Sequence, residues 1–414
     1  MTADVRTNCV PSARPPRFFL TNQAAGPLTI ELLTYLHDRG IACRVLAGSL
    51  SCAPEPLAGI ACHKGRQLVK HSALLRLWTW GLFTLQGIWA IIRNRREDVL
   101  VVTNPPTLLL AMPLLKRLFG VRYALLQYDI YPDIAERMGM FKPGGWIARL
   151  WRRLSRKSML GARAVITLSP DMADVLRSHL RSGDDLPIEI IPTWVDTEAI
   201  RPRERCDNPF AREHGLVDKF VVMYAGSFGA ANDIDSIIDA AGLLTDLPDV
   251  HFMLIGGGTR QAEIAERVAS LGLKNLTLLP LQPLVTMPQV LPSADCQVVT
   301  LDEVYAGVAM PSKTYPAMAA GCALLAVCPP GSALTTLATG DHCGLHVLPR
   351  HPAELAAAIR RLRDDAALLK QCKERGRQLA EERSSQKPNL EKFHAVLAKG
   401  FGWPVEGLVD IRTP

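Results

Sequence analysis

The chain has 414 residues, of which 48% are hydrophobic and 21% charged, and this composition excludes a disordered or collagen-like protein. Its length predicts two or three domains, and we take two. Lys and Arg outnumber Asp and Glu by 47 to 40, and the net charge of +7 favours an anionic partner such as nucleic acid, acidic lipid or a phosphorylated small molecule.

The N-terminal segment, MTADVRTNCVPSARPPRFF, has no apolar run after its basic residues, so it lacks the hydrophobic region of a secretory signal. We therefore expect a cytoplasmic protein. The ten cysteines include no C-x-x-C pair and no zinc-like spacing, so neither a disulfide framework nor a metal site is predicted.

Strand-like and helical segments alternate over residues 1–195. The strand-like segments are RFFLTN, ACRVLAG, DVLVVTNPP, YALLQYD and AVITLSP, and helices are expected around 30–39, 108–119 and 171–180. This alternation is typical of a parallel sheet covered by helices on both faces, so it predicts a Rossmann-like N-terminal domain.

The most apolar stretch of this domain runs from Leu77 to Ile92 and includes Trp78, Trp80 and Trp89. It falls short of the roughly 20 residues that a membrane span requires. Either a core helix or a helix on the surface of an anionic membrane would explain it.

A second segment, from Arg149 to Arg163, interleaves basic residues with Leu150, Trp151 and Leu154. It predicts an amphipathic helix that either lies on an anionic membrane or presents a solvated basic face.

A linker is predicted at 196–212, where Pro202 and Pro209 interrupt the periodicity and charges cluster. The alternation then restarts. Strand-like segments are FVVMYAG, HFMLIGGG, LTLLPL, CQVVTL, ALLAVCPP and CGLHVL, and helical patterns lie at 233–244, 260–271, 312–320 and 352–363. This predicts a second Rossmann-like domain over 213–385.

Residues 386–414 are expected to form a C-terminal helix and tail that return toward the N-terminal domain. The fold class is therefore α/β, with two doubly wound parallel sheets facing a central cleft. Open α/β sheets bind their ligands at the carboxyl ends of the strands, so we look for function in that cleft.

The most specific local pattern is Met310-Pro311-Ser312-Lys313-Thr314 at the start of a predicted helix. A serine suited to the N-cap, free N–H groups and a lysine together favour an anion site that a diphosphate would fit. An ordinary capped helix ending at Gly321 explains the same residues.

Two glycine-rich segments follow strands of the second domain, one at Gly226 and one at Gly256–Gly258. Glycine lets the backbone approach a ligand closely, and a tight turn requires it equally. Neither segment completes G-x-G-x-x-G, so a nicotinamide dinucleotide site is not predicted.

In the first domain, Asp129 and Asp133 follow a strand, where each could bond sugar hydroxyls or accept a proton. For Asp133 we prefer helix capping after Pro132. Nucleic acid is not expected as a partner, because aromatic residues make up only 6% of the chain and no recognition motif is present.

Taken in order, these segments resemble glycosyltransferase family 4, which has the GT-B fold, and within it the bacterial surface-polysaccharide branch with a P-S-K motif. The similarity covers almost the whole chain. The segments are NQAAGPLTIELLTYLHDRGIACRVLAG, VVTNPP, YDIYPD, PTWVDTE, YAGSFGAANDID, LIGGG, LPLQPLVTMPQVLPSADCQVV and VAMPSKTYPAMAAG.

The resemblance implies a retaining, metal-independent and cofactor-free transfer. A sugar would pass from a UDP- or GDP-sugar to a lipid-linked or glycan acceptor held by the N-terminal domain. The basic and tryptophan-rich segments further lead us to expect a peripheral place on the inner face of the cell membrane. Neither the sugar, the acceptor nor the oligomeric state follows from the residues.

By position, the resemblance places Asp129 and Tyr128 at the reacting sugar. It assigns donor binding to Gly226, Ser227, Asn232, Gly256, Gly257, Gly258, Leu281, Ser312, Lys313 and Thr314. The family's Glu-x7-Glu pair maps onto Val308 and Pro316, so both carboxylates are missing. Two alternatives therefore stay open, a catalytically weak partner or activator of another transferase and, ranked last, a nucleotide-sugar epimerase.

Overall fold

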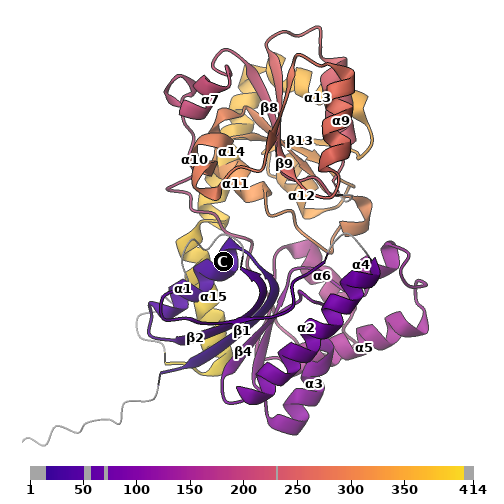
Figure 1. The fold of residues 1–414 in the computed structure, drawn as a ribbon, viewed down its shortest axis with the longest axis vertical. Coiled ribbons are helices and arrows are strands. Elements are labelled where there is room, and N and C mark those ends of the chain that lie inside the picture. Colours follow the sequence, from indigo (N-terminus) through magenta and orange to yellow (C-terminus); the bar gives the residue numbers. More distant parts are fainter. Residues whose placement is uncertain (1–14, 51–56, 70–72, 230–231, 405–414) are drawn as a thin grey trace, which may run out of the picture.

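The structure is a computed structural model that describes residues 15–50, 57–69, 73–229 and 232–404. It contains two α/β domains, drawn one above the other in Figure 1, and each is built on one parallel sheet. The predicted architecture of two doubly wound sheets is confirmed. The N-terminal segment considered as a secretory signal lies mostly outside the described residues.

The N-terminal sheet contains, over the described residues, seven parallel strands in the order β3-β2-β1-β4-β5-β6-β7. Their bounds are β1 Arg17–Ala25, β2 Ala42–Leu50, β3 Ala61–Lys64, β4 Asp98–Val102, β5 Tyr123–Gln127, β6 Val165–Thr167 and β7 Ile188–Ile190. Every residue of β4 and β5 is buried, because helices cover both faces of a parallel sheet.

Two helix layers cover this sheet. One layer consists of α1 (Pro27–His37) and α15 (Gln386–Phe401), and the other of α2 (Ala73–Arg93), α3 (Leu108–Phe119), α5 (Trp146–Gly161) and α6 (Pro170–Ser178). Successive strand residues point to opposite layers, so Leu100 packs with the first layer and Val99 and Val101 with the second.

The C-terminal sheet contains, within the described part of the chain, six parallel strands in the order β10-β9-β8-β11-β12-β13. Their bounds are β8 Phe220–Ser227, β9 Val250–Gly257, β10 Leu276–Pro280, β11 Cys296–Thr300, β12 Ala323–Val327 and β13 Gly344–Val347. One face is covered by α8 (Ile234–Leu243), α9 (Gln261–Leu271) and α13 (Pro352–Asp364). The other is covered by α7 (Pro209–Glu213), α10 (Met287–Val290) and α11 (Thr314–Ala319), with α14 (Ala366–Arg383) beside α11.

The last helix packs against the first domain. The chain crosses back where Val195 N donates to Ser384 O at 2.8 Å, and α15 then lies under the N-terminal sheet. Just after α15, the indole N–H of Trp403 donates to the buried Asp98 carboxylate at 2.7 Å. One apolar cluster also continues from the N-terminal core into Val308 and Leu324, so the two domains share buried contacts.

The strands that the sequence predicted are all present, and β3 and β7 were not predicted. Both are short, and all four residues of β3 are exposed, so neither shows the pattern of a buried strand. The predicted start of a helix at Ser312 is wrong, because α11 begins at Thr314 and its N-cap position is Lys313. Thr314 closes the preceding turn instead, with its N–H and hydroxyl both donating to Pro311 O.

The tryptophan-rich stretch forms helix α2, which has one face in the core and another face on the surface. Trp80 is buried, whereas Trp78 and Trp89 are 61% and 64% exposed. Among the described residues, no helix combines the length and the hydropathy that crossing a bilayer requires.

Candidate active site

The glycine segments of the C-terminal sheet lie side by side at the carboxyl ends of β8, β9 and β10. Gly226 pairs with Gly256 and Ser227 with Gly257, while Pro280 at the end of β10 also pairs with Gly256. The next residue, Leu281, is 70% exposed. The structure therefore brings together most of the predicted donor-binding residues.

Packing alone requires glycine at two of these positions. A Cβ on Gly256 would lie 2.0 Å from Gly226 O, and one on Gly258 would lie 2.7 Å from Phe228 O. Gly258 also has a φ of 151°, which favours glycine. These glycines let the two strand ends approach each other, whatever ligand binds beside them.

Hydrogen bonds fix the turn after β8. Ser227 O accepts from the Tyr224 hydroxyl at 2.7 Å and from Asn232 Nδ2 at 3.1 Å, and Asn232 Oδ1 accepts from Thr300 Oγ1 at 3.0 Å. The predicted residues Ser227 and Asn232 are thus linked directly. Tyr224 was not predicted to take part, because it reads as an ordinary strand aromatic.

Lys313 has the most unusual environment of the predicted site residues. Its ammonium nitrogen is buried and has no hydrogen-bond partner among the described residues. It lies 3.8 Å from the centroid of the Tyr224 ring, and a Cβ on Gly226 would be 3.2 Å from it. Burial lowers the pKa of Lys313 to about 7. A cation-π contact offsets only part of this cost, so the site favours an anion beside Gly226.

The two residues on either side of Lys313 differ from it and from each other in exposure. Ser312 is exposed and makes no hydrogen bond to any described residue, whereas Thr314 is fully buried with its hydroxyl on Pro311 O. Their predicted contacts with phosphate oxygens stay predictions.

On the N-terminal side, Tyr128 and Asp129 follow β5. The backbone N–H groups of both donate to Thr103 Oγ1, at 3.0 and 3.4 Å. Burial, with a smaller effect from Glu31, raises the pKa of Tyr128. Its phenol therefore stays protonated at neutral pH and is suited to donate a hydrogen bond rather than to act as a base.

Asp129 belongs to an electrostatic cluster that joins the domains. Burial raises the pKa of Tyr131 and of Tyr305, the charge of Asp129 raises both further, and the charge of Arg76 lowers both. Tyr305 comes from the C-terminal domain, and Arg76 from α2. Sequence reasoning did not single out Arg76 or Tyr305, because only the fold brings them to Asp129, whereas Tyr131 lies two residues after Asp129 in the YDIYPD segment.

The segment after β11 closes on the N-terminal domain. Ile130 N donates to Val308 O at 3.1 Å, and the Arg137 guanidinium donates to Val304 O and Ala306 O. The residues after β5 and those just before Ser312 therefore meet at the domain junction.

The preferred interpretation of Asp133 as a helix cap is wrong. The helix α4 (Asp133–Arg137) has Pro132 at its N-cap, and the Asp133 carboxylate instead contacts Arg152 and His179, both at 2.9 Å. Burial would raise the pKa of Asp133, but these two partners outweigh it and hold that pKa at about 2. Asp133 is therefore an ionised structural group.

Two family models match the chain in succession. Glycosyltransferase Family 4 matches residues 25–199, and Glycosyl transferases group 1 matches residues 208–379. Together they cover both sheets and both sides of the candidate site. The chain is a family-4-like glycosyltransferase.

Curated relatives agree with this assignment. This chain is 28% identical over 308 residues to the probable glycosyltransferase WbjE of Pseudomonas aeruginosa. The alignment covers 74% of this chain and 75% of the relative. The chain is 26% identical over 257 residues to the putative colanic acid biosynthesis glycosyl transferase WcaI of Escherichia coli K12, covering 60% and 62%.

Solved structures show the same fold. Sucrose-phosphate synthase from Thermosynechococcus elongatus matches with a TM-score of 0.73 at 15% identity, covering 94% of this chain and 100% of that one. Anabaena Alr3699/HepE in complex with UDP matches with a TM-score of 0.70 at 15% identity, covering 92% and 99%. These matches confirm the predicted GT-B fold.

The glycosyltransferase lacks carboxylates where the family resemblance implies them. Val308 is fully buried in the shared apolar cluster, and its carbonyl accepts from Ile130. Pro316 lies inside α11. At these positions the chain uses packing and a backbone hydrogen bond in place of acidic side chains.

Proposed function

We propose that the protein transfers a sugar from a nucleotide diphosphate sugar, with UDP or GDP as the carrier, to a lipid-linked or glycan acceptor in surface-polysaccharide biosynthesis. The transfer retains the anomeric configuration. The name of WcaI, which refers to colanic acid biosynthesis, and the structures of HepE with UDP and UDP-glucose support this proposal.

The observation that carries the proposal is the buried ammonium of Lys313 beside the turn at Gly226. A buried cation without a partner is unfavourable, and a diphosphate placed against the glycine turn would supply the missing negative charge. The same charge would stabilise the nucleotide diphosphate as it leaves the sugar.

We propose that the reacting sugar lies between this turn and Asp129. The closed junction at Ile130 and Val308 supports this placement, because it holds the strand ends of the two domains together. Asp129 and Tyr128 then face the sugar from the N-terminal side, Tyr128 as a hydrogen-bond donor.

We further propose that the enzyme works at the anionic cytoplasmic face of the cell membrane. On α5, Trp146 and Leu150 are 69% and 48% exposed, and the neighbouring Arg149, Arg153 and Lys157 are exposed. Two other basic residues of this helix do not contribute free charge, because Arg152 pairs with Asp133 and Glu136 and Arg156 with Asp184.

Calorimetry with UDP, GDP, ADP and their common sugar conjugates tests the donor site. We expect one nucleotide diphosphate to bind, and Lys313→Met to weaken it roughly ten- to hundredfold, the value of a hydrogen bond to a charged group. The exposed Lys370, replaced in the same way, serves as the control. If none of these ligands binds, the proposal fails. Binding without sugar transfer to any acceptor would favour the alternative role as an activator.

A further inference from the structure

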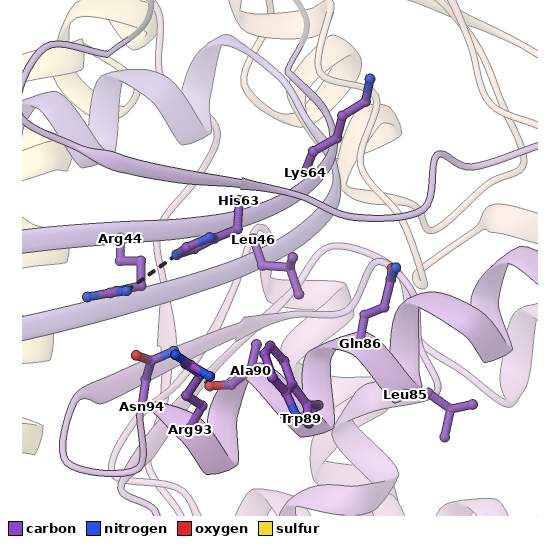
Figure 2. Close-up of a pocket in the computed structure, with 10 residues that line it drawn as sticks. All are labelled: Arg44, Leu46, His63, Lys64, Leu85, Gln86, Trp89, Ala90, Arg93 and Asn94. Carbon is purple, nitrogen blue, oxygen red and sulfur yellow. Dashed lines mark hydrogen bonds between the residues drawn. The ribbon is translucent and has the colours of Figure 1, made fainter.

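A groove of about 690 Å³ lies between the exposed edge of the N-terminal sheet and the C-terminal half of α2. Figure 2 shows Arg44 of β2 and His63 of β3 on one side, with Leu85, Trp89 and Arg93 of α2 on the other, while the Lys64 side chain points away from α2. The groove lies outside the candidate active site, and its residue Trp89 belongs to the stretch for which the sequence left a membrane-surface helix open.

The groove is cationic. Its lining includes the side chains of Arg44 and Arg93 and no Asp or Glu. Lys64 borders the groove but pairs with Ala47, so its ammonium is directed to the opposite face of the sheet. The Arg44 guanidinium donates to His63 Nε2 at 3.3 Å and pairs with Glu97 at 3.4 Å. Arg93 has no ion pair with any described residue, and it stacks 5.3 Å from the Trp89 ring. The groove therefore offers an anion one uncompensated charge, that of Arg93, with the paired Arg44 also in its lining.

An apolar stripe on α2 ends at this groove. Leu74, Trp78, Leu85 and Trp89 are 80%, 61%, 65% and 64% exposed. At about 100° per residue these four positions lie within roughly 60° of one another, so they form one line along the helix. A large exposed apolar surface next to an uncompensated cation is typical of a membrane-binding face.

We propose that this groove binds the phosphate group of an anionic glycerophospholipid while Leu85 and Trp89 enter the boundary between headgroups and acyl chains. This inference rests on the proposed function at a membrane. A free phosphate would use the charges but leave the stripe in water, whereas a lipid satisfies both. Arg and Trp are suited to that boundary, because each combines an apolar body with a polar end.

The placement also relates the membrane to the active site. Near the start of the same helix, the Trp80 ring lies 5.6 Å from the ring of Tyr131, which belongs to the Asp129 cluster. Helix α2 therefore runs from the lipid groove to the domain junction. Docking along the stripe would hold that junction near the membrane, where a lipid-linked acceptor is available.

Co-sedimentation of the full-length protein with vesicles tests the proposal. Vesicles of phosphatidylcholine alone are compared with vesicles of equal parts phosphatidylcholine and phosphatidylglycerol. We expect binding to the anionic vesicles, and a roughly fivefold loss in Arg93→Gln, the effect of one charge near the surface. The matched control is Lys274→Gln, which removes one exposed charge from another face and should bind like the parent protein.

Three results would overturn the inference. One is unchanged vesicle binding by the groove variant while Arg149→Gln/Arg153→Gln on α5 loses it. Another is equal loss in the groove variant and its control. A third is that inorganic pyrophosphate binds the groove without lipid while vesicles do not bind. UDP binding measured without vesicles reports on the proposed function separately, and the groove variant should retain it.

Discussion

Replacing Lys313 by Met should stabilise the ligand-free protein and weaken donor binding at the same time. Methionine has a similar length and keeps the contact with the Tyr224 ring, but it removes the buried charge. The substitution therefore separates the cost of burying the ammonium from its use in binding.

The magnitude follows from the pKa of Lys313, which burial lowers from its ordinary 10.5 to about 7. At 1.36 kcal/mol per pH unit this difference corresponds to at most about 5 kcal/mol, and we expect about 2 to 4 kcal/mol after relaxation around the charge. Between these two values the unfolded chain holds a proton that the folded chain has released. The free energy of unfolding should thus rise with pH between about 7 and 10.5. Below about pH 7 it should stay low by the full cost of burying the charged ammonium.

Urea denaturation at several pH values measures this effect. In Lys313→Met the rise should be absent, and the gain in stability should be largest at and below neutral pH and should shrink toward pH 10.5. Lys370→Met, at an exposed lysine, should change neither the free energy of unfolding nor its dependence on pH. A variant that is less stable than the parent protein, or that keeps the same slope, would refute the reasoning.

Donor binding should show the opposite dependence. A diphosphate beside the ammonium raises the pKa of Lys313, so binding takes up a proton above about pH 7 and affinity falls as pH rises. Calorimetry in buffers of different ionisation enthalpy detects that proton. Affinity that does not change with pH, with no proton taken up, would show that Lys313 is not the diphosphate contact.

Three further predictions concern the framework of the site. Gly256→Ala should lose about 1 to 3 kcal/mol of unfolding free energy, since its Cβ would lie 2.0 Å from a backbone oxygen. Gly242→Ala, in the exposed part of a helix, should be neutral or stabilising by up to about 1 kcal/mol, and urea denaturation compares the two variants. Asp133→Asn should cost about 2 kcal/mol near pH 5, and acid titration of stability should show the difference shrinking as pH falls toward 2, where the parent carboxylate is protonated. Trp403→Phe should cost about 1 to 3 kcal/mol and speed hydrogen exchange in α15, because the buried Asp98 loses its indole donor; unchanged exchange there would contradict the inferred anchoring.

The chain order of strands and helices was readable because each parallel strand is buried on both faces and forms a continuous apolar run, as β4 and β5 do. The exposed strand β3 has no such run, so one wall of the cationic groove was not predicted. The helix start at Ser312 was misplaced for a local reason. The sequence shows a suitable capping side chain, but Thr314 bonds back to Pro311 and moves the first turn by two residues.

The sequence by itself determined the two α/β domains, the glycine turns at the ends of β8 and β9, and Lys313 as the cation among them, because these depend on local residue order and periodicity. Only the tertiary structure decided which residues surround those groups. It placed Tyr224 under the Lys313 ammonium, Arg76 and Tyr305 near Asp129, and Arg152 and His179 on Asp133. These contacts join residues far apart in the chain, and the pKa of each ionisable group depends on burial and charge in space, which no sequence spacing records.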